Sequence, residues 1–443
     1  MKIVIVGAGE VGRYVAKMLS NENHDITIMD ESEERLQDLD TNYDIMSRVG
    51  SPTSITDLQM CGVRNCDLFI AVNTSESVNT TACIIASKLG ARRTLARIDN
   101  YEYLLPKNKE MFKSLGIDKL IYPEVLAATE IVQALKRSWI REYRTFSNEA
   151  LVLVCVKIRE NSEIINKVFS TGFFNHSMYR IVAVKRHTTT IIPNGNDQIL
   201  ANDLVYFICS KDNLEYVRKA AGKTNFDIKD IIIMGGSKIA LKTVQYLPND
   251  INVKIIENDR EKCYKLADKT DTLIIHGDGR NIDLLKDEGI EDADAFIALT
   301  DNSETNVLSC LAAKRLGIRK TIAEVENIDY IDLADNLDIG TLINKKLIAA
   351  SHIYQQTLDE DAYDVQCLTY SDAEVVEFVV KAGDKITKDR VRNLNLPDDV
   401  NIGGVVRNGK GHVVNGNTII LPGDHVVIFC KATAVPKLAK FFN

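Results

Sequence analysis

Residues 3–12 read IVIVGAGEVG, an apolar run followed at once by a glycine-rich turn and the start of a helical pattern. The run is broken by glycine too early for a signal peptide, so it predicts a buried first strand. Gly7 permits a tight turn, Gly9 leaves the backbone open to a phosphate, and Gly12 lets helix and strand pack closely. The helix N-terminus would present its unpaired N–H groups to an anion.

The same pattern recurs in the second half of the chain, where residues 231–240 read IIIMGGSKIA. Residues 66–100 align with residues 293–327 without a gap, at an offset of 227 residues and with 13 identities in 35 positions. Two unrelated segments would not keep register for so long, which indicates an internal duplication. A second, smaller duplication relates residues 180–209 to residues 401–430.

The order of the repeats predicts the fold class. In each large copy, short apolar strands such as residues 2–6 alternate with amphipathic stretches of helical length, such as residues 78–89. This alternation is typical of a doubly wound parallel sheet of the Rossmann type, covered by helices on both faces. The small copies carry strand signals separated by Asn/Gly turns. We therefore expect an α/β fold with two tandem Rossmann-type sheets, each followed by a small β-rich (α+β) module. The expected domains are residues 1–143, 144–224, 228–358 and 363–443.

A long helical pattern at residues 123–143 separates the first large module from the first small one. Pro123 suits a first helical turn, and Val125, Ile131 and Leu135 fall on roughly one side. Either a crossover or dimerising helix, or a helix that covers its own sheet, accounts for this pattern.

Composition excludes several classes of protein. The chain has 443 residues, 45% of them hydrophobic and 26% charged, as expected for a globular protein of several domains. A formal net charge of −8 argues against nucleic acid as the main partner. The nine cysteines and seven histidines are scattered, which favours reduced thiols and no metal site. No apolar stretch approaches the ~20 residues that span a bilayer.

Further polar residues are expected to meet the first glycine loop. Asp30 ends the second strand, 21 residues after Gly9. A carboxylate there would bridge ribose hydroxyls and repel a 2′-phosphate, which favours an adenine nucleotide and disfavours NADP. Asn73 and Thr74 follow the next strand, at the carboxyl edge of the sheet where ligands lie. Arg97 ends the strand after that, where it would reach the phosphates or pair with a surface carboxylate.

The second copy differs at the positions that would face the phosphates. Ser237 stands where the first copy has Gly9, so that a Cβ occupies the path of the phosphate. Glu324 replaces the cation Arg97 by an anion. We expect the second site to be weaker, altered or empty.

Other changes in the second copy are milder. Ala240 at the third glycine position is a tolerated variant, and Glu257 in place of Asp30 would still suit ribose. Lys238 or Arg280 could compensate for the lost cation.

These motifs together resemble a known family. The glycine loop with its terminal acid, the stretch GSPTSITDLQMCGVRNCDLFIAV (50–72), its copy GDGRNIDLLKDEGIEDADAFIAL (277–299) and the small β module are similar to RCK domains, also called KTN domains. These are regulators of potassium conductance. Two such units in tandem over essentially the whole chain resemble the peripheral regulatory subunits of Trk potassium-uptake systems.

The resemblance implies a function and a site. It implies a non-catalytic cytoplasmic subunit, peripheral on the inner face of the membrane, that binds NAD(H) or ATP/ADP. It also implies a homo-oligomer, expected as a tetrameric ring, under an integral-membrane potassium-translocating subunit of the TrkH/TrkG type. Carried over by position, the nucleotide contacts fall on Gly7, Ala8, Gly9, Glu10, Val11, Gly12, Asp30, Asn73, Thr74 and Arg97. The second set falls on Met234, Gly235, Gly236, Ser237, Lys238, Glu257, Thr300, Asp301 and Glu324.

In the small modules, Asp203 and Asp424 follow the NGN turns at equivalent positions, as do the landmarks Arg186 and Arg407. In the family such a module can bind a ligand or dimerise, but both aspartates can equally be turn-forming residues.

Two other functions share the glycine loop. A nicotinamide-dependent oxidoreductase would need a substrate domain with a placed acid or base, and the small modules show no convergent His/Lys/Asp constellation. An interaction protein with a vestigial nucleotide site would be expected to have lost Gly9 and Asp30. We therefore expect a regulator with a working first site and no catalytic residue.

Overall fold

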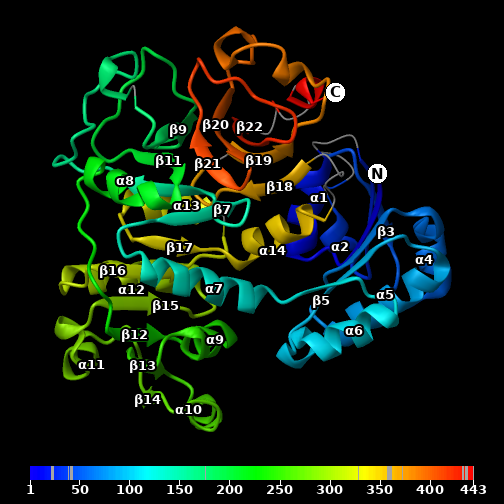
Figure 1. The fold of residues 1–443 in the computed structure, drawn as a ribbon. Coiled ribbons are helices and arrows are strands. Elements are labelled where there is room, and N and C mark those ends of the chain that lie inside the picture. The colour runs from blue at the N-terminus through cyan, green and yellow to red at the C-terminus, as the bar shows by residue number, and fades with distance from the viewer. Residues whose placement is uncertain are drawn as a thin grey trace. The chain divides into compact units, whose positions relative to one another are not determined.

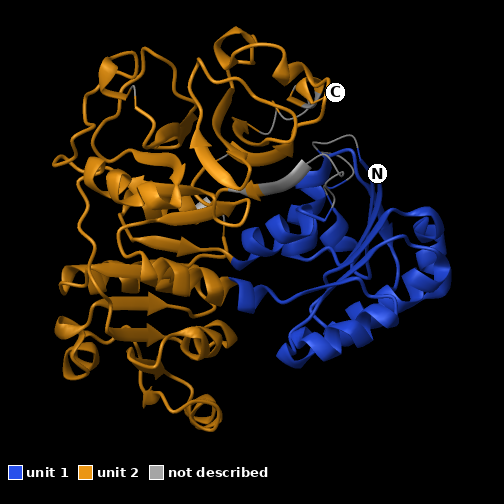
Figure 2. Ribbon diagram, viewed as in Figure 1, with its two compact units in different colours: residues 1–126, 345–358 blue, residues 127–344, 359–443 orange. Residues whose placement is uncertain are grey.

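The computed structural model describes all residues except 21–23, 38, 40–42, 175, 328, 357–361, 372, 432–433, 435–437 and 443. The chain divides into two compact units (Figure 2). Unit 1 comprises residues 1–126 and 345–358, and unit 2 comprises residues 127–344 and 359–443. The expected domain boundary at residue 358 lies outside the described residues.

Unit 1 is built on a six-stranded sheet in the order β3-β2-β1-β4-β5-β6 (Figure 1). All its neighbouring strands are parallel, with Val6 of β1 opposite Met29 of β2 and Ala71 of β4. The chain changes direction across the sheet between β1 and β4, which is the switch point where doubly wound sheets bind ligands. The strands are β1 (Lys2–Val6), β2 (Asp25–Asp30), β3 (Met46–Val49), β4 (Leu68–Ala71), β5 (Thr94–Arg97) and β6 (Lys119–Ile121).

The helices of unit 1 connect these strands. Helix α1 (Glu10–Ser20) begins inside the glycine loop and buries Val15 and Leu19. Helix α14 (Lys345–Tyr354) packs against α1, although in sequence it follows the second parallel sheet. The others are α2 (Glu33–Leu36), α4 (Ile55–Met60), α5 (Glu76–Leu89), α6 (Pro106–Ser114) and the 3-10 turns η1 (Val63–Asn65) and η2 (Tyr101–Leu104).

Helix α7 (Pro123–Lys136) is shorter than the helical pattern at residues 123–143 predicted. The chain turns after Lys136, where the Ile140 N–H donates to the Arg137 carbonyl at 3.0 Å, and a strand begins at Glu142. Within this turn the Ser138 hydroxyl donates to the Phe226 carbonyl at 3.0 Å. From residue 127 onward α7 belongs to unit 2, while α14 belongs to unit 1. The helix that follows each parallel sheet in sequence, α7 or α14, is thus assigned wholly or mostly to the other unit. This arrangement favours a crossover helix over a helix that covers its own sheet.

The parallel sheet of unit 2 repeats the first one strand for strand, in the order β14-β13-β12-β15-β16-β17. Its strands are β12 (Asp230–Met234), β13 (Asn252–Glu257), β14 (Leu273–His276), β15 (Ala295–Ala298), β16 (Lys320–Glu324) and β17 (Thr341–Ile343). Its helices are α9 (Lys238–Tyr246), α10 (Arg260–Ala267), α11 (Ile282–Asp287), α12 (Ser303–Arg315) and α13 (Asp329–Asn336), with the 3-10 turn η5 (Ile290–Asp292).

Two five-stranded antiparallel sheets complete unit 2, in the orders β10-β9-β11-β8-β7 and β18-β19-β22-β20-β21. The first module holds β7 (Glu142–Phe146), β8 (Leu151–Lys157), β9 (Arg180–Arg186), β10 (Thr189–Ile191), β11 (Leu204–Ser210), α8 (Leu214–Ala220), η3 (Gly172–Phe174) and η4 (Lys211–Asn213). The second holds β18 (Ala362–Cys367), β19 (Ala373–Val379), β20 (Val400–Arg407), β21 (Lys410–Val413), β22 (His425–Lys431), η6 (Lys385–Thr387), η7 (Val391–Asn393) and η9 (Ala439–Phe441). The predicted fold class is confirmed.

Eight of the nine cysteines are buried and form no disulfide: Cys61, Cys66, Cys83, Cys155, Cys209, Cys263, Cys310 and Cys430. Among the described residues, no group of three or more His, Cys, Asp or Glu side chains could hold a metal ion. No helix in this part of the chain is long and apolar enough to cross a membrane.

Candidate functional site

The glycines of the first loop have different surroundings. Gly7 has a φ of +102°, and a Cβ on it would lie 2.9 Å from the backbone nitrogen of Asn73. A Cβ on Gly12 would lie 1.9 Å from the Gly7 carbonyl oxygen, so helix α1 can approach the loop only with glycine there. A Cβ on Gly9 would meet no atom within 4 Å. Gly7 and Gly12 are therefore needed by the fold itself, while the space beside Gly9 stays open.

Asp30 holds this loop from the end of β2. One of its carboxylate oxygens accepts from the Ala8 N–H at 2.7 Å, and the other accepts from the Ser32 N–H at 2.9 Å. The guanidinium of Arg35 lies 3.7 Å away. The residue is 5% exposed, and each oxygen keeps a lone pair for a further donor. Asp30 can thus shape the loop and still accept a hydroxyl.

The side chains of the loop itself divide by burial. Ala8 and Val11 are buried, so only their backbone atoms can face a ligand. Glu10 is 70% exposed, and its carboxylate pairs with the ammonium of Lys346 on α14, inside unit 1.

Asn79, which the sequence analysis missed, fixes the ends of β4 and β5. Its side-chain oxygen accepts from the Asn73 N–H at 2.8 Å, and its amide nitrogen donates to the carbonyls of Asn73 and Arg97, both at 2.9 Å. The side-chain nitrogen of Asn73 is buried and has no hydrogen-bond partner in the described structure. Thr74 beside it is exposed. An amide donor at the carboxyl edge of the sheet is therefore available to a ligand.

Arg97 is held loosely at the same edge. Its guanidinium lies 3.7 Å from the Glu124 carboxylate, and the two side chains are 23% and 12% exposed. The other carboxylate oxygen of Glu124 is buried without a partner in the described structure. Arg97 therefore forms an ion pair, as one of the two alternatives predicted, but the 3.7 Å separation is long for such a pair.

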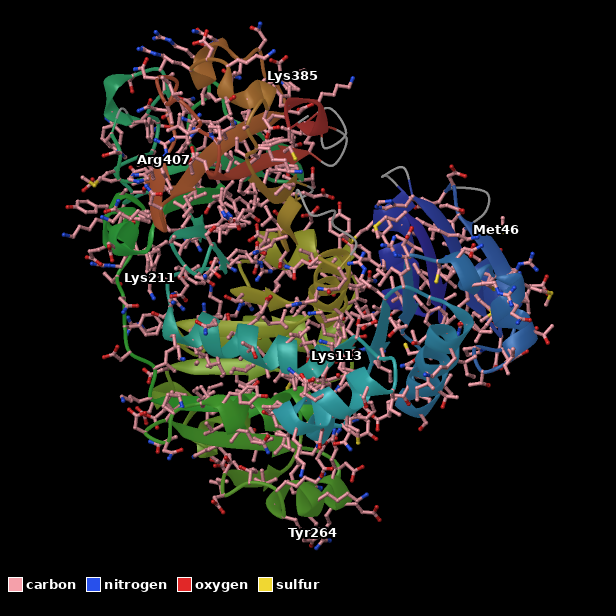
Figure 3. All side chains as sticks on the ribbon, turned by 45° about the vertical axis from the view of Figure 1, so that its right-hand side comes forward. Met46, Lys113, Lys211, Tyr264, Lys385 and Arg407 are labelled. Carbon is pink, nitrogen blue, oxygen red and sulfur yellow. The ribbon has the colours of Figure 1, made fainter. Side chains whose placement is uncertain are left out.

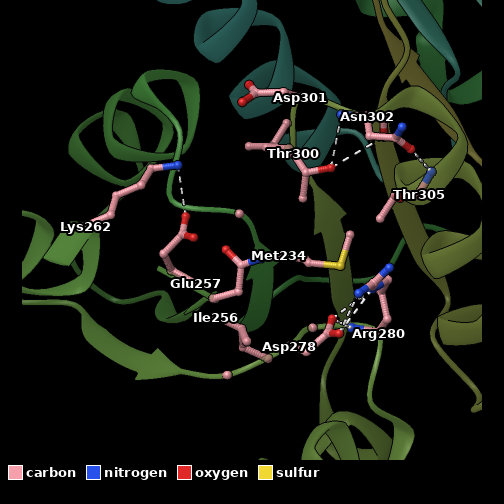
Figure 4. Close-up of a pocket in the computed structure, with 15 residues that line it drawn as sticks. Met234, Ile256, Glu257, Lys262, Asp278, Arg280, Thr300, Asp301, Asn302 and Thr305 are labelled. Atoms are coloured by element: carbon pink, nitrogen blue, oxygen red, sulfur yellow. Dashed lines mark hydrogen bonds and ion pairs between the residues drawn. The ribbon is translucent and has the colours of Figure 1, made fainter. Parts of the chain in front are cut away.

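The corresponding edge in unit 2 encloses a cavity of about 310 Å³ (Figure 4). It is lined by residues from the glycine loop, the end of β13, the segment after β14 and the segment after β15. Of the predicted second set, the residues that line it are Met234, Gly235, Glu257, Thr300 and Asp301. The described lining does not include Gly236, Ser237, Lys238 or Glu324. Glu324 is only 3% exposed.

Ser237 turns its side chain onto its own helix. Its hydroxyl oxygen accepts from the Ala240 N–H at 3.2 Å and so caps α9. A hydroxyl in this place satisfies one of the N–H groups that a phosphate would otherwise use. The changed loop therefore has one fewer unpaired N–H group to offer to an anion.

Glu257 repeats the role of Asp30. It accepts from the Gly236 N–H at 2.8 Å and pairs with Lys262 at 3.0 Å (Figure 4). Although burial opposes it, hydrogen bonds from the Asp259 N–H, from Lys262 and from the Gly236 N–H hold the pKa of Glu257 below its usual range. The sequence analysis missed Lys262, yet it follows Glu257 at the spacing at which Arg35 follows Asp30.

Arg280 lines the second cavity, but it does not offer a spare charge. Its guanidinium forms a two-point ion pair with Asp278, at 2.8 Å between the closest atoms (Figure 4). The hydrogen bond from Arg280 also lowers the pKa of Asp278. Arg280 was expected to compensate for the loss of Arg97, but its charge is already paired with Asp278, which the sequence pattern did not reveal.

The landmark residues of the small modules pair with each other. Arg186 donates to both carboxylate oxygens of Asp203, at 3.0 and 2.8 Å, and Arg407 does the same to Asp424, at 2.8 and 2.7 Å. Arg407 is marked in Figure 3. Asp203 and Asp424 are 2% and 1% exposed. Each ion pair fixes the turn before the last strand of its module, which favours a structural role for Asp203 and Asp424 over ligand binding.

Comparisons with known proteins agree with this layout. The TrkA-N domain matches residues 3–123 and 231–345, and the TrkA-C domain matches residues 153–222 and 375–443. The Trk system potassium uptake protein TrkA of Halomonas elongata is 30% identical over 438 residues, covering 97% of this chain and 95% of that protein. The TrkA protein of Haemophilus influenzae is 31% identical over 454 residues, covering 100% and 99%.

Solved structures share the fold at low sequence identity. The RCK domain of GsuK has a TM-score of 0.60 at 15% identity, covering 99% of this chain and 94% of that chain. The GsuK channel bound to NAD has a TM-score of 0.60 at 14% identity, covering 100% and 78%. GsuK bound to ADP has a TM-score of 0.51 at 14% identity, covering 80% and 68%.

Tandem Rossmann sheets, each followed by an antiparallel module, correspond to the two TrkA-N and two TrkA-C domains in order, and the GsuK RCK domain shares this fold. The chain belongs to the TrkA family of Trk system potassium uptake proteins. The predicted family is confirmed. So is the prediction that the chain is not an enzyme, because the family is a regulatory and non-enzymatic one.

Proposed function

We propose that this chain is the peripheral cytoplasmic regulatory subunit of a potassium-uptake system, and that it responds to an adenine nucleotide in the first cleft. The observation that carries the proposal is the pairing of open space beside Gly9 with a carboxylate, Asp30, that already holds the loop. The names of the relatives, potassium uptake proteins, and the titles of the GsuK structures with NAD and ADP support it.

In this proposal each part of the nucleotide meets a different group. The phosphates lie over Gly9 at the N-terminus of α1, where the backbone N–H groups favour an anion. The ribose hydroxyls donate to the remaining lone pairs of Asp30. The Asn73 amide supplies a buried donor, and Arg97 turns from its long pair with Glu124 toward the phosphates. NAD(H), ATP and ADP all offer these groups.

The second cleft is proposed to bind the same ligands more weakly or not at all. Ser237 already caps α9, and Arg280 is neutralised by Asp278. Glu257 keeps the acceptor for ribose, but no cation replaces Arg97 in the buried position of Glu324.

Regulation requires that the nucleotide bind two arrangements of the protein with different affinity, since equal binding shifts no population. Moving a gate from mostly shut to mostly open takes about 5.5 kcal/mol of differential binding, which the subunits of a ring can share. We propose a homo-oligomeric, tetrameric ring on the inner face of the membrane, acting on a potassium-translocating subunit of the TrkH/TrkG type.

A complementation experiment tests this function. Cells that lack their own copy of the chain are given the wild-type protein or the variant Gly9→Ser, and potassium uptake is measured. The substitution fills open space and should fold, so the expected result is normal protein level with at least a fivefold change in uptake rate. Gly172→Ser is the matched control, because Gly172 also faces open space and lies outside the cleft. Equal uptake with all three proteins would contradict the proposal.

A further inference from the structure

Unit 2 contains another polar cavity of about 450 Å³, whose described lining includes no residue of the glycine loop of that unit. Three parts of the chain form its walls: the turn between α7 and β7, the first antiparallel module, and the second parallel sheet with α12 and the turn after α13 (Figure 1). Its basic lining residues are Arg141, Lys157, Arg159, Lys223, Lys314, Arg319 and Lys320.

The described lining sets these seven cations against one carboxylate, Asp338. Asp338 is shared, since it pairs with Arg141, with Arg159 and, at 2.8 Å, with Lys314. Lys157 pairs at 2.8 Å with a different carboxylate, Asp335, which is not among the described lining residues. The chain as a whole carries a formal charge of −8, so the local excess of positive charge does not follow from composition.

The remaining cations have no carboxylate partner among the described residues. The Lys320 ammonium donates only to the Ile140 carbonyl at 3.0 Å and to the Thr341 hydroxyl at 2.9 Å. Lys223 makes no ion pair in the described structure, and Arg319 lies over the ring of Phe226 at 3.7 Å. Of these three, Lys320 is 4% exposed and Lys223 is partly buried, whereas Arg319 is exposed. An uncompensated buried cation destabilises a fold, so an anion in the cavity would offset the cost of burying Lys320.

Arg141 uses only one of the two terminal nitrogens of its guanidinium group. Its side chain is nine-tenths buried, and one nitrogen of its guanidinium binds Asp338. The other terminal nitrogen is buried and has no hydrogen-bond partner in the described structure. Guanidinium groups bind phosphate through two parallel hydrogen bonds, so half of this fork is unused.

We infer that this cavity binds a compact, multiply charged phosphate group, such as a free polyphosphate or the phosphates of a nucleotide. Several cations approach from different sides, which suits an anion with many oxygens better than a single flat carboxylate. The volume is in the range of small-molecule sites. The bound anion would join the first antiparallel module to the second parallel sheet and so stiffen unit 2.

Two lysine pKa values agree with the geometry. Burial and the nearby Arg141 lower the pKa of Lys320 to about 7. Burial, Arg159, Arg141 and Lys314 lower the pKa of Lys223 to about 8, against the opposing effect of Asp338. An anion in the cavity would raise both values, so binding near pH 7.5 is accompanied by proton uptake.

The test is a calorimetric titration of the full chain with inorganic tripolyphosphate at pH 7.5, in buffers of different ionisation enthalpy. Lys223→Gln and Arg159→Gln are expected to raise Kd at least tenfold, and Lys223→Gln also to reduce proton uptake. Lys223 has no native ion pair to lose, so this variant should fold. Lys410→Gln, which makes the same charge change at the exposed first residue of β21, should bind like the wild type.

Two results would overturn the inference: no binding by the wild-type chain, or an equal Kd in Lys223→Gln and Lys410→Gln. A parallel titration with ADP separates the two sources of phosphate. If Lys223→Gln also weakens ADP binding, the site takes nucleotides. If ADP binding is unchanged while tripolyphosphate binding is lost, it takes inorganic polyphosphate.

Discussion

At the scale of single residues, the buried Asn79 side chain joins the ends of β4 and β5 through three hydrogen bonds. Asn306 makes the corresponding bonds in unit 2, to Thr300 and to the Glu324 carbonyl. Both are 0% exposed, and an unpaired buried backbone group costs about 1–3 kcal/mol. These asparagines are therefore expected to hold the ligand edge of each parallel sheet.

We predict that Asn79→Ala lowers the free energy of unfolding of unit 1 by about 2–3 kcal/mol, because it leaves buried backbone groups unpaired. Urea unfolding followed by circular dichroism measures this. Asn417→Ala, on an exposed turn, is the control and should change the value by less than about 0.5 kcal/mol. Equal unfolding midpoints for both variants would show that the three bonds do not support the sheet edge.

Part of the candidate site could be predicted from the sequence because its residues carry a local pattern. Gly7 and Gly12 stand where only glycine fits, and Asp30 ends a strand at a fixed distance from them. Asn79 was missed because it acts on strand ends that are brought together by the sheet and not by spacing in the sequence. Lys262 was missed although its spacing from Glu257 repeats that of Arg35 from Asp30. The duplication did hold a signal, since Asn79 and Asn306 are identical at aligned positions.

At the scale of elements, the two antiparallel modules approach each other closely along β20 and β21. A Cβ on Gly411 would lie 2.1 Å from the carbonyl oxygen of Ala150, and one on Gly404 would lie 2.7 Å from the Leu151 side chain. A backbone oxygen cannot move aside as a side chain can. The glycines of these strands thus set how tightly the modules pack.

We predict that Gly411→Ala destabilises unit 2 by about 1–3 kcal/mol through overpacking against the Ala150 backbone. Scanning calorimetry should record a lower midpoint for its transition. The control is Gly172→Ala, where a Cβ meets no atom within 4 Å. If the two variants melt together, the modules are packed less tightly than the structure indicates.

The secondary structure followed from the sequence better than the path of the connecting helices did. Apolar strand patterns and the repeat predicted both parallel sheets, because a buried parallel strand depends on local composition. Helix α7 is an example: it ends at Lys136, and the turn that follows it contains a hydrogen bond from Ser138 to Phe226, 88 residues away in sequence, which local composition does not reveal. The placement of α14 in unit 1 is likewise determined by tertiary packing, since α14 packs against α1.

At the scale of the whole molecule, Asp338 links the first antiparallel module to the second parallel sheet within unit 2. Despite the opposing effect of burial, Arg141, Lys314 and Arg159 hold the pKa of its carboxyl well below the usual range. A carboxyl whose folded pKa is lowered stabilises the fold above its unfolded pKa, near 3.9. That contribution is lost as pH falls below about 4 toward the folded pKa.

We predict that Asp338→Asn lowers the stability of unit 2 by about 1–3 kcal/mol at pH 7, because it leaves the buried Arg141 and the partly exposed Arg159 and Lys314 without their shared carboxylate. The effect should shrink as the pH falls below about 4. Asparagine tolerates the φ of +59° at this position, so the backbone is not strained. Thermal unfolding across pH 2.5–7 measures the change. A variant whose loss of stability stays constant down to pH 2.5 would contradict the role of the charge.

The proposed function requires that the first cleft of each chain bind an adenine nucleotide and that the second cleft bind it more weakly or not at all. The most direct measurement is a calorimetric titration of the purified full chain with NADH, counting sites per chain in the wild type, in Gly9→Ser and in the control Gly172→Ser. We expect one NADH site per chain, which is lost in Gly9→Ser and kept in the control. Two equivalent sites, or binding that survives Gly9→Ser, would contradict it.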